Sequence, residues 1–262
     1  MTTPAAVEDE VHALTIDAHL RALKMPGALR EYRDLAREAK ASGTDPLAFL
    51  AALLSREMDN RRANQIAQRL RDARFPYPKD LESFDFSAAP DIPKARVLDL
   101  ARAAFVEARE NVLCLGASGT GKTHLAIAIA RSAIFQGYRT RFVTATALMN
   151  ELLTAQAKLE LPKVLRAWNR YDAIVIDEVG YTPFAPDGAR LLFQFFADLY
   201  ERRSLILTTN LEFSQWTNVF GDPTMTSALL DRVTHRAHII PTGKDSFRLR
   251  QAKGRNQGEG RA

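Results

Sequence analysis

The chain has 262 residues, of which 46% are hydrophobic and 26% charged, as expected of a soluble globular protein with one large domain or a domain and an appendage. A formal net charge of +5 allows a polyanionic partner without requiring one. The sequence contains no stretch of about 18 uninterrupted apolar residues, the length that a membrane-spanning helix needs. The single cysteine, Cys114, excludes an internal disulfide, which fits a reducing, cytoplasmic compartment.

The first part of the chain is predicted to form a small helical domain over residues 14–79. Residues 1–13 are polar, lack the pattern of a signal peptide, and are expected to be disordered. Pro26-Gly27 and the loop Ser42–Pro46 should separate three helices, with Thr44 or Asp45 capping the third. Two apolar stripes at helical spacing support this prediction: Tyr32, Leu35, Ala36 and Ala39, and then Leu47, Leu50, Ala51, Leu54 and Met58.

The end of this helical region is basic. From Arg56 to Lys79 there are seven basic and three acidic residues, and the aromatic Phe75 and Tyr77 lie near the end of this segment. Lysine and arginine can neutralise DNA phosphates, but a charge run is also the usual composition of a solvated helix face. The composition of this segment leaves both interpretations open.

Residues 80–93 are predicted to be a linker into a second domain over residues 94–250, and residues 251–262 to be a disordered tail. A helix is expected over Lys94–Arg109. After it, apolar strands alternate with helices, which indicates an α/β domain with a parallel sheet. The expected strands are Asn111–Leu115, Thr140–Ala145, Ala173–Ile176 and Ser204–Thr209, and the expected helices are His124–Ala130, Leu148–Leu153 and Ala189–Arg202.

The octapeptide Gly116–Thr123 fits the G-x-x-x-x-G-K-[ST] pattern of a phosphate-binding P-loop. Its glycines let the backbone turn tightly, so that its N–H groups can point at phosphate oxygens. Lys122 would reach the β- and γ-phosphates, and the Thr123 hydroxyl would hold Mg²⁺. The apolar strand before the loop and the helix after it favour this interpretation over a chance glycine-rich turn, because the helix N-terminus would face the anion.

Acidic residues follow the third expected strand directly. Asp177 would hold the Mg²⁺ shell beside Thr123, and Glu178 would take a proton from the attacking water. An isolated acidic pair is more often a surface feature, but its place behind an apolar strand and after a P-loop favours a catalytic role.

Two further side chains have alternatives that their own sequence context leaves open. Asn210 ends the fourth expected strand, where it could orient the water or touch the γ-phosphate, or could be a turn residue of the kind asparagine favours. Arg232 could neutralise charge in a neighbouring subunit's site, although a surface salt bridge with Asp231 or another acid is the simpler interpretation.

Together these features resemble the IstB-type ATP-binding helper proteins of insertion-sequence transposition, which are relatives of the helicase loader DnaC among the AAA+ ATPases. The resemblance runs from about Leu14 to Arg250. It rests on several stretches, namely Ala73–Lys79 ahead of Leu81–Phe86, Leu115–Ala126, Ile176–Tyr181, Ser204–Asn210, Phe220–Pro223 and Leu230–Ile239.

The resemblance implies an AAA+ P-loop NTPase core with a parallel sheet, preceded by a small all-helical N-terminal domain for DNA or partner binding. It implies ATP and Mg²⁺ as cofactors, with Thr123 and Asp177 as metal ligands. Lys122, Glu178, Asn210 at the sensor-1 position and Arg232 as a trans-acting arginine finger would be catalytic, and Arg248 falls where a sensor-2 arginine could lie. The implied nucleotide-binding residues are Gly116, Ala117, Ser118, Gly119, Thr120, Gly121, Lys122, Thr123, His124 and Asp177.

By the same resemblance, the protein would form homo-oligomers on double-stranded DNA, with ATP sites between subunits, and would regulate a partner transposase. The basic segment 56–79 and the stretch 154–170 become candidates for DNA contact. A DnaC-like helicase loader is the alternative, but loader N-termini often carry cysteine-rich metal sites and this region has no cysteine. A small-molecule P-loop kinase is disfavoured because no helical lid with paired arginines is seen.

Overall fold

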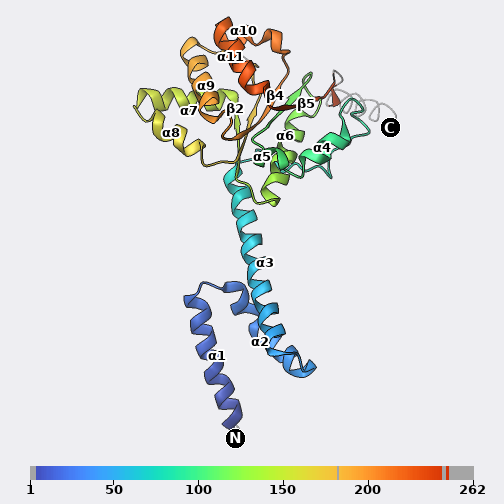
Figure 1. The fold of residues 1–262 in the computed structure, drawn as a ribbon, viewed down its shortest axis with the longest axis vertical. Coiled ribbons are helices and arrows are strands. Elements are labelled where there is room, and N and C mark those ends of the chain that lie inside the picture. The colour runs from blue at the N-terminus through green and yellow to red at the C-terminus, as the bar shows by residue number, and fades with distance from the viewer. Residues whose placement is uncertain (1–3, 182, 244–245, 248–262) are drawn as a thin grey trace, which may run out of the picture. The chain divides into compact units, whose positions relative to one another are not determined.

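A computed structural model describes residues 4–181, 183–243 and 246–247, and the chain divides into two compact units, one ending at Gln68 and the other beginning at Arg69 (Figure 1). The division falls earlier than the expected domain boundary at residue 79. The division lies inside helix α3, which ends at Ala73. Composition and turn residues mark the end of a helix, so they place the boundary after it. None of the described helices is both long enough and apolar enough to cross a membrane.

The first unit is built from the three expected helices, α1 (Pro4–Ala22), α2 (Pro26–Ser42) and α3 (Pro46–Ala73). The Asp45 carboxylate caps α3 by accepting hydrogen bonds from the N–H groups of Leu47 (2.9 Å) and Ala48 (3.1 Å). Residues 4–13 differ from the expectation of disorder because they form the start of α1. Their polarity hid a run of good helix formers that begins with a proline, a residue favoured in a first helical turn.

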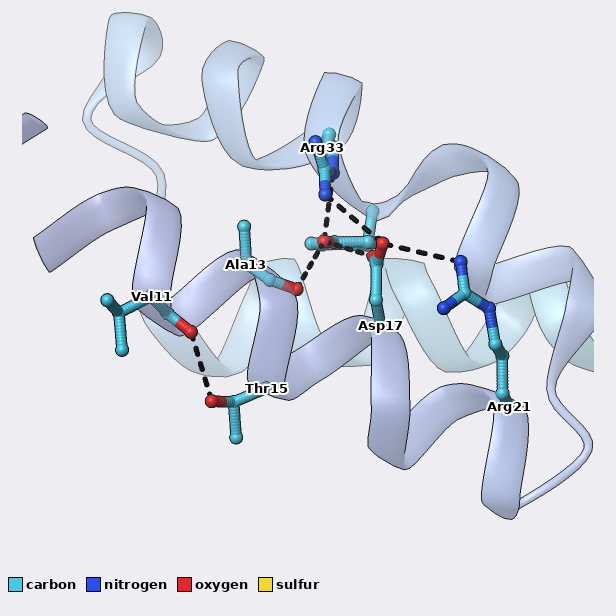
Figure 2. Close-up of polar contacts among 7 residues, drawn as sticks. Val11, Ala13, Thr15, Asp17, Arg21 and Arg33 are labelled. Carbon is cyan, nitrogen blue, oxygen red and sulfur yellow. Dashed lines mark hydrogen bonds and ion pairs between the residues drawn. The ribbon is translucent and has the colours of Figure 1, made fainter. Parts of the chain in front are cut away.

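Helices α1 and α2 are joined by a polar cluster around Asp17 (Figure 2). The hydroxyl of Tyr32 lies 2.6 Å from Asp17 Oδ1 and 3.1 Å from the Ala13 carbonyl oxygen. Arg33 donates to the Tyr32 hydroxyl (2.9 Å) and to Asp17 Oδ2 (3.2 Å), and Arg21 lies 3.6 Å from the same carboxylate. The hydrogen bond from Tyr32, helped by the nearby arginines, holds the pKa of Asp17 below its ordinary value.

Helices α2 and α3 are joined by a buried carboxylate. Glu57 accepts hydrogen bonds from the N–H groups of Gly27 (2.8 Å) and Ala28 (3.0 Å) at the start of α2, and from Arg61 Nε (2.7 Å). Gly27 permits this approach, because a Cβ there would lie 2.9 Å from both Asn60 Cβ and Glu57 Oε2. Burial alone would raise the pKa of Glu57, but these hydrogen bonds together lower it below its ordinary value.

The apolar stripe expected to pack α3 does not do so within this unit. Leu47, Leu50, Leu54 and Met58 are 74%, 47%, 45% and 64% exposed, and Ala51 is exposed too. The buried positions of this part of the helix are instead Leu53 and Glu57, which lie on a different face. Sequence periodicity failed here because the charged Glu57 is held by the N–H groups of α2, so the core-facing side of α3 carries a polar residue.

We expect Glu57→Gln to lower the free energy of unfolding of the first unit by about 1–3 kcal/mol, because the buried hydrogen bonds lose their charged acceptor. Since the folded pKa of Glu57 is depressed, this contribution is complete above about pH 4.5 and is lost as the pH falls through the folded pKa. Hydrogen exchange of the α2 amides in the full chain would measure it. Glu31→Gln is the matched control, because Glu31 is 44% exposed and pairs with Arg56 at 3.6 Å, so its loss should change protection little. Equal α2 protection in the two variants would contradict the role of Glu57.

The second unit contains a parallel sheet in the order β2-β3-β4-β1-β5, which confirms the predicted α/β class. Its strands are β1 (Asn111–Leu115), β2 (Thr140–Thr144), β3 (Ala173–Asp177), β4 (Ser204–Thr209) and β5 (Ala237–Pro241). Four of these were expected. The fifth was missed because its five residues include a histidine and a proline. It pairs with β1 along its whole length, from Asn111↔Ala237 to Leu115↔Pro241.

Helices cover both faces of this sheet (Figure 1). Alternate strand residues face opposite cores, as the pleat requires. Leu113, Ile176 and Leu207 face one core, which is completed by α7 (Ala145–Ala157), α8 (Leu161–Trp168), α9 (Pro186–Leu199), α10 (Thr217–Phe220) and α11 (Pro223–Thr234). Cys114 and Val175 face the other, completed by α4 (Lys94–Leu100), α5 (Ala104–Glu107) and α6 (Lys122–Phe135). Burial raises the pKa of the Cys114 thiol to about 12, so this side chain behaves as a small apolar residue.

Two expectations for the approach to the sheet need correction. The single helix predicted over Lys94–Arg109 is two short helices, α4 and α5, because Ala103 between them has a left-handed backbone with φ 62°. The predicted linker 80–93 contains no helix or strand, yet it is more than a connection. Its apolar side chains pack against the core that contains α6, and they are Leu81, Phe84, Phe86, Ala89 and Ile92.

Candidate functional site

The P-loop connects β1 to α6 at the carboxyl end of the sheet. Gly121 ends it with φ 95°, and a Cβ at this position would lie 2.9 Å from the ring of Phe84. Both observations require glycine here. The loop is tied to the end of β5, because Thr120 Oγ1 lies 2.6 Å from Thr242 Oγ1 and also donates to the Ala117 carbonyl (2.9 Å). The loop is therefore pre-shaped, with the N-terminus of the 14-residue α6 behind it.

Lys122 lies across this loop. Its ammonium group donates hydrogen bonds to the carbonyl oxygens of Gly116 (2.8 Å) and Ala117 (2.6 Å). The side chain is half-buried, so its charge is kept near the N-terminus of α6, where it adds to the positive end of the helix dipole. The arrangement suits an anion with several oxygens, such as a polyphosphate.

Thr123 and Asp177 lie face to face although they are far apart in the sequence. The Thr123 hydroxyl is 2.9 Å from Asp177 Oδ1 and 3.1 Å from Oδ2, and Asp177 is only 4% exposed. A hydroxyl and a carboxylate beside a phosphate site are the hard oxygen ligands that Mg²⁺ accepts, with phosphate oxygens and water supplying the rest. The residues present therefore fit Mg²⁺, and Thr123 and Asp177 are the ones that would hold it.

Beyond Asp177 the chain turns sharply. Glu178 has φ 61°, a left-handed conformation that is uncommon for a residue other than glycine, and its side chain is exposed. Its N–H donates to the hydroxyl of Thr208 on β4 (2.9 Å), and that hydroxyl in turn donates to Asp177 Oδ1. The turn ends β3, and Glu178 lines the pocket beside the P-loop.

This pocket has a volume of about 590 Å³. The P-loop, Glu178, Thr208 and Asn210 line one part of it, and Asn210 is exposed at its wall. Residues of the segment that precedes α4 line another part, and sequence reasoning did not place them at the site, namely Tyr77, Lys79, Ser83, Phe84, Asp85 and Ala89. Their signal was present in the aromatic residues of the stretches 73–79 and 81–86.

His124 connects that segment to α6. Its Nε2 donates to the Asp80 carbonyl oxygen (2.8 Å), and its ring meets Phe84 edge to face with centroids 5.0 Å apart. Burial lowers the pKa of His124 below its ordinary value, although the Asp80 carbonyl opposes the shift. His124 therefore shapes the pocket as a neutral ring and holds residues 80–84 against the start of α6.

Four predicted site residues are not among those that line this pocket, namely Gly116, Ala117, Asp177 and Arg232. Gly116 and Ala117 accept hydrogen bonds from Lys122 and Asp177 accepts one from Thr123, so these three lie directly behind the lining, whereas Arg232 lies elsewhere.

Arg232 is half-buried on α11, where its guanidinium stands 5.1 Å from the ring centroid of Phe193 and donates to the Ala228 carbonyl oxygen (2.9 Å). Among the residues that the structure describes, no ion pair joins Arg232 to Asp231 or to another acidic residue, so the simpler salt-bridge interpretation is not supported. Arg248 lies outside the described residues.

The two candidate DNA-contact stretches, 56–79 and 154–170, both contain basic side chains that form ion pairs with nearby glutamates. Arg56 and Arg61 pair with Glu31 and Glu57 inside the first unit, at 3.6 and 2.7 Å. In the stretch 154–170, Lys163 pairs with Glu160 at 3.2 Å, and Leu159 between the two helices is 90% exposed with φ 58°. These are exposed pairs apart from Glu57, and such pairs leave their cations available to a polyanion.

Comparison with known proteins finds relatives that are named for ATP binding, in agreement with the P-loop. A family model described as "IstB-like ATP binding protein" matches residues 16–255. A relative from insertion sequence IS5376 of Geobacillus stearothermophilus, named for ATP binding, is 35% identical and covers 91% of this chain and 95% of its own length. Another, from insertion sequence IS21 of Pseudomonas aeruginosa and also named for ATP binding, is 34% identical with coverages of 91% and 90%.

Solved structures show the same fold at low identity. The crystal structure of DnaI matches with a TM-score of 0.52 and 16% identity, covering 62% of this chain and 90% of that one. The crystal structure of a DNA replication initiation factor matches with a TM-score of 0.51 and 20% identity, covering 62% and 49%. At these identities the likeness shows the fold alone, a parallel sheet with helices on both faces.

The family match includes every part of the pocket described above. Residues 16–255 contain the P-loop, the Asp177–Glu178 corner, Asn210 and Arg232, together with the pocket-lining segment before α4. The match covers far more than half of the chain, and two relatives exceed 30% identity over nine-tenths of it. The chain belongs to the family of IstB-like ATP-binding proteins.

Proposed function

We propose that the protein is a DNA-binding AAA+ ATPase that assembles with ATP on double-stranded DNA and regulates a partner transposase of an insertion sequence. One observation carries this proposal. Most of the P-loop, including Thr123, and Glu178 line a single pocket, and Asp177 lies behind it, hydrogen-bonded to Thr123. This arrangement supports phosphate, metal and general-base chemistry at one site. The names of the relatives, which place them in insertion sequences, support the biological setting.

At this site each residue has a distinct role in the proposed hydrolysis of ATP. The P-loop amides and Lys122 bind the phosphates, and Thr123 and Asp177 hold Mg²⁺, which when bound neutralises charge on the transferring phosphoryl group. Glu178 accepts a proton from the attacking water, and Asn210 orients that water. Arg232 acts from a neighbouring subunit, which is why we propose homo-oligomers with ATP sites between subunits.

Lys122→Ala should weaken ATP binding by about a factor of thirty or more, because the phosphates lose charge-assisted hydrogen bonds. Titration of a fluorescent ATP analogue against the purified protein would measure the change. Lys40→Ala, which removes an exposed lysine of α2, is the control and should bind as the parent does. Undiminished affinity in Lys122→Ala would remove the P-loop from the nucleotide site.

ATP hydrolysis measured with and without duplex DNA, across protein concentration, tests the proposed function. Stimulation by duplex DNA that rises more than linearly with protein would support an assembling, DNA-dependent ATPase. Stimulation by single strands alone would favour a DnaC-like helicase loader instead. DNA affinity should also fall steeply with salt, because contacts between lysine or arginine and phosphate release counterions. A flat salt dependence would argue against the basic segment 56–79 as the DNA surface.

A further inference from the structure

We propose that Thr208 is a positioning residue for the nucleotide site: its hydroxyl holds the Asp177–Glu178 corner in the shape that sets Asp177 against Thr123 and Glu178 at the pocket. This inference rests on the proposed function, and it assigns a role to a residue two positions before the expected sensor Asn210. Thr208 is 1% exposed and lies on β4, the strand next to β3 in the sheet.

The regular pairing of β3 with β4 ends just before this corner. Its last residue pair is Ile176↔Leu207, after which the backbone ladder stops. Thr208 continues the connection by other means. Its side-chain hydroxyl accepts from the Glu178 N–H (2.9 Å), and its carbonyl oxygen accepts from the Val179 N–H (2.9 Å). The hydroxyl is therefore the acceptor for the Glu178 amide, which lies beyond the last residue pair of the ladder.

The backbone of Glu178 needs such support. A left-handed conformation at a residue with a Cβ is sparsely populated and persists only where its surroundings hold it. Here φ is 61°, and the bond from the amide of the same residue to Thr208 is the direct restraint on that peptide. Without the hydroxyl, we expect the peptide to relax and the Glu178 side chain to leave its place at the pocket.

Asp177 depends on the same hydroxyl. Its carboxylate accepts from two hydroxyl groups, those of Thr123 and Thr208. Thr123 would also bind the metal ion through its oxygen, whereas the hydrogen of the Thr208 hydroxyl has Asp177 as its acceptor, so Thr208 would orient this carboxylate whether or not the ion is bound. Partners of metal ligands orient them, and their loss typically lowers metal affinity or activity by about 10- to 100-fold.

Three variants test this role in the full chain. Thr208→Val keeps the shape and removes the hydroxyl, Thr208→Ala removes it with less volume, and Thr208→Ser retains it. Thr140→Val is the matched control, because Thr140 is a buried strand residue (1% exposed) whose hydroxyl has no hydrogen-bond partner in the part of the chain that the structure describes. The measurements are kcat and KM for ATP, the affinity of a fluorescent ATP analogue with and without Mg²⁺, and the thermal midpoint.

We expect Thr208→Val and Thr208→Ala to lower kcat about tenfold or more, and to raise the Mg²⁺ concentration needed for nucleotide binding, with Mg²⁺-free affinity nearly unchanged. Thr208→Ser should stay within about threefold of the parent in both respects. A merely structural role would lower the thermal midpoint and leave kcat and the Mg²⁺ requirement of the folded protein unchanged.

Two outcomes would overturn the inference. One is a folded Thr208→Val or Thr208→Ala protein with parental kcat and Mg²⁺ requirement. The other is a Thr208→Ser protein as impaired as Thr208→Val. If the parent protein itself hydrolysed no ATP with any DNA, the proposed function would fail instead, and the Mg²⁺ dependence of nucleotide binding would still report on Thr208.

Discussion

Replacing Arg232 with alanine is expected to reduce ATP turnover about a thousandfold while each subunit still binds ATP. The guanidinium does not line the pocket of its own chain, so its loss leaves the P-loop and the metal ligands intact. It is nevertheless held in a defined place, over the Phe193 ring and against the Ala228 carbonyl. An arginine fixed in this way can serve a site that another subunit brings to it, where it would neutralise charge that develops during phosphoryl transfer.

A mixing experiment separates action in trans from damage to the fold. Arg232→Ala lacks the finger but retains an intact pocket, and Lys122→Ala lacks the pocket but retains the finger. Mixed oligomers should therefore recover part of the turnover that neither variant has alone. Arg102→Ala, which removes a surface arginine whose side chain is 82% exposed, is the control and should turn over normally. No recovery on mixing, with both variants folded and able to assemble, would contradict the role in trans.

The strands of the second unit could be predicted because their signals are local. Runs such as Ala173–Ile176 are buried on both faces in a parallel sheet, so they are apolar throughout and bounded by polar residues. The fifth strand was not predictable in this way, because β5 is not apolar throughout: it contains His238, and its Ile239 and Pro241 are exposed. Its partner, β1, lies more than a hundred residues earlier in the chain, and no local pattern reports such pairing.

In the first unit, local apolar spacing predicted a helix but gave the wrong buried face. The apolar spacing of α3 predicted that a helix forms but not which face is buried, because the buried face is fixed by a charge. Glu57 is drawn in by the N–H groups at the start of α2, whereas Leu47, Leu50, Leu54 and Met58 stay exposed in this unit. Such a choice depends on an approach between two helices that neither helix encodes alone.

The candidate site divides in the same way. The P-loop and the Asp177–Glu178 pair could be predicted, because their residue types and spacing are required by the chemistry. The tie from Thr208 to that pair, the tie from Thr242 to the P-loop, and the wall built by Tyr77 and Phe84 could not. Threonine and phenylalanine are ordinary strand and core residues, so only the folded arrangement distinguishes these positions from others of their kind.

Glu178→Gln is expected to lower kcat for ATP hydrolysis by about a factor of a thousand, because the amide cannot accept the proton of the attacking water. Glutamine has nearly the same shape and imposes the same demand on the left-handed backbone at φ 61°, so the substitution isolates the carboxylate from the fold. Since Glu178 is exposed at the pocket and Asp177 is the carboxylate proposed to bind the metal, affinity for ATP should remain close to that of the parent.

The measurement is single-turnover hydrolysis beside nucleotide affinity, with Glu107→Gln, an exposed glutamate of α5, as the control that should behave as the parent. If ATP supports assembly on DNA and hydrolysis reverses it, the Glu178→Gln protein should also stay on DNA once ATP is bound. A parental rate in Glu178→Gln would exclude this carboxylate as the general base. If Glu178→Gln lowered both the hydrolysis rate and the affinity for ATP, Glu178 would be assigned to nucleotide binding. A general base acts on the attacking water, so its loss should leave the affinity for ATP unchanged.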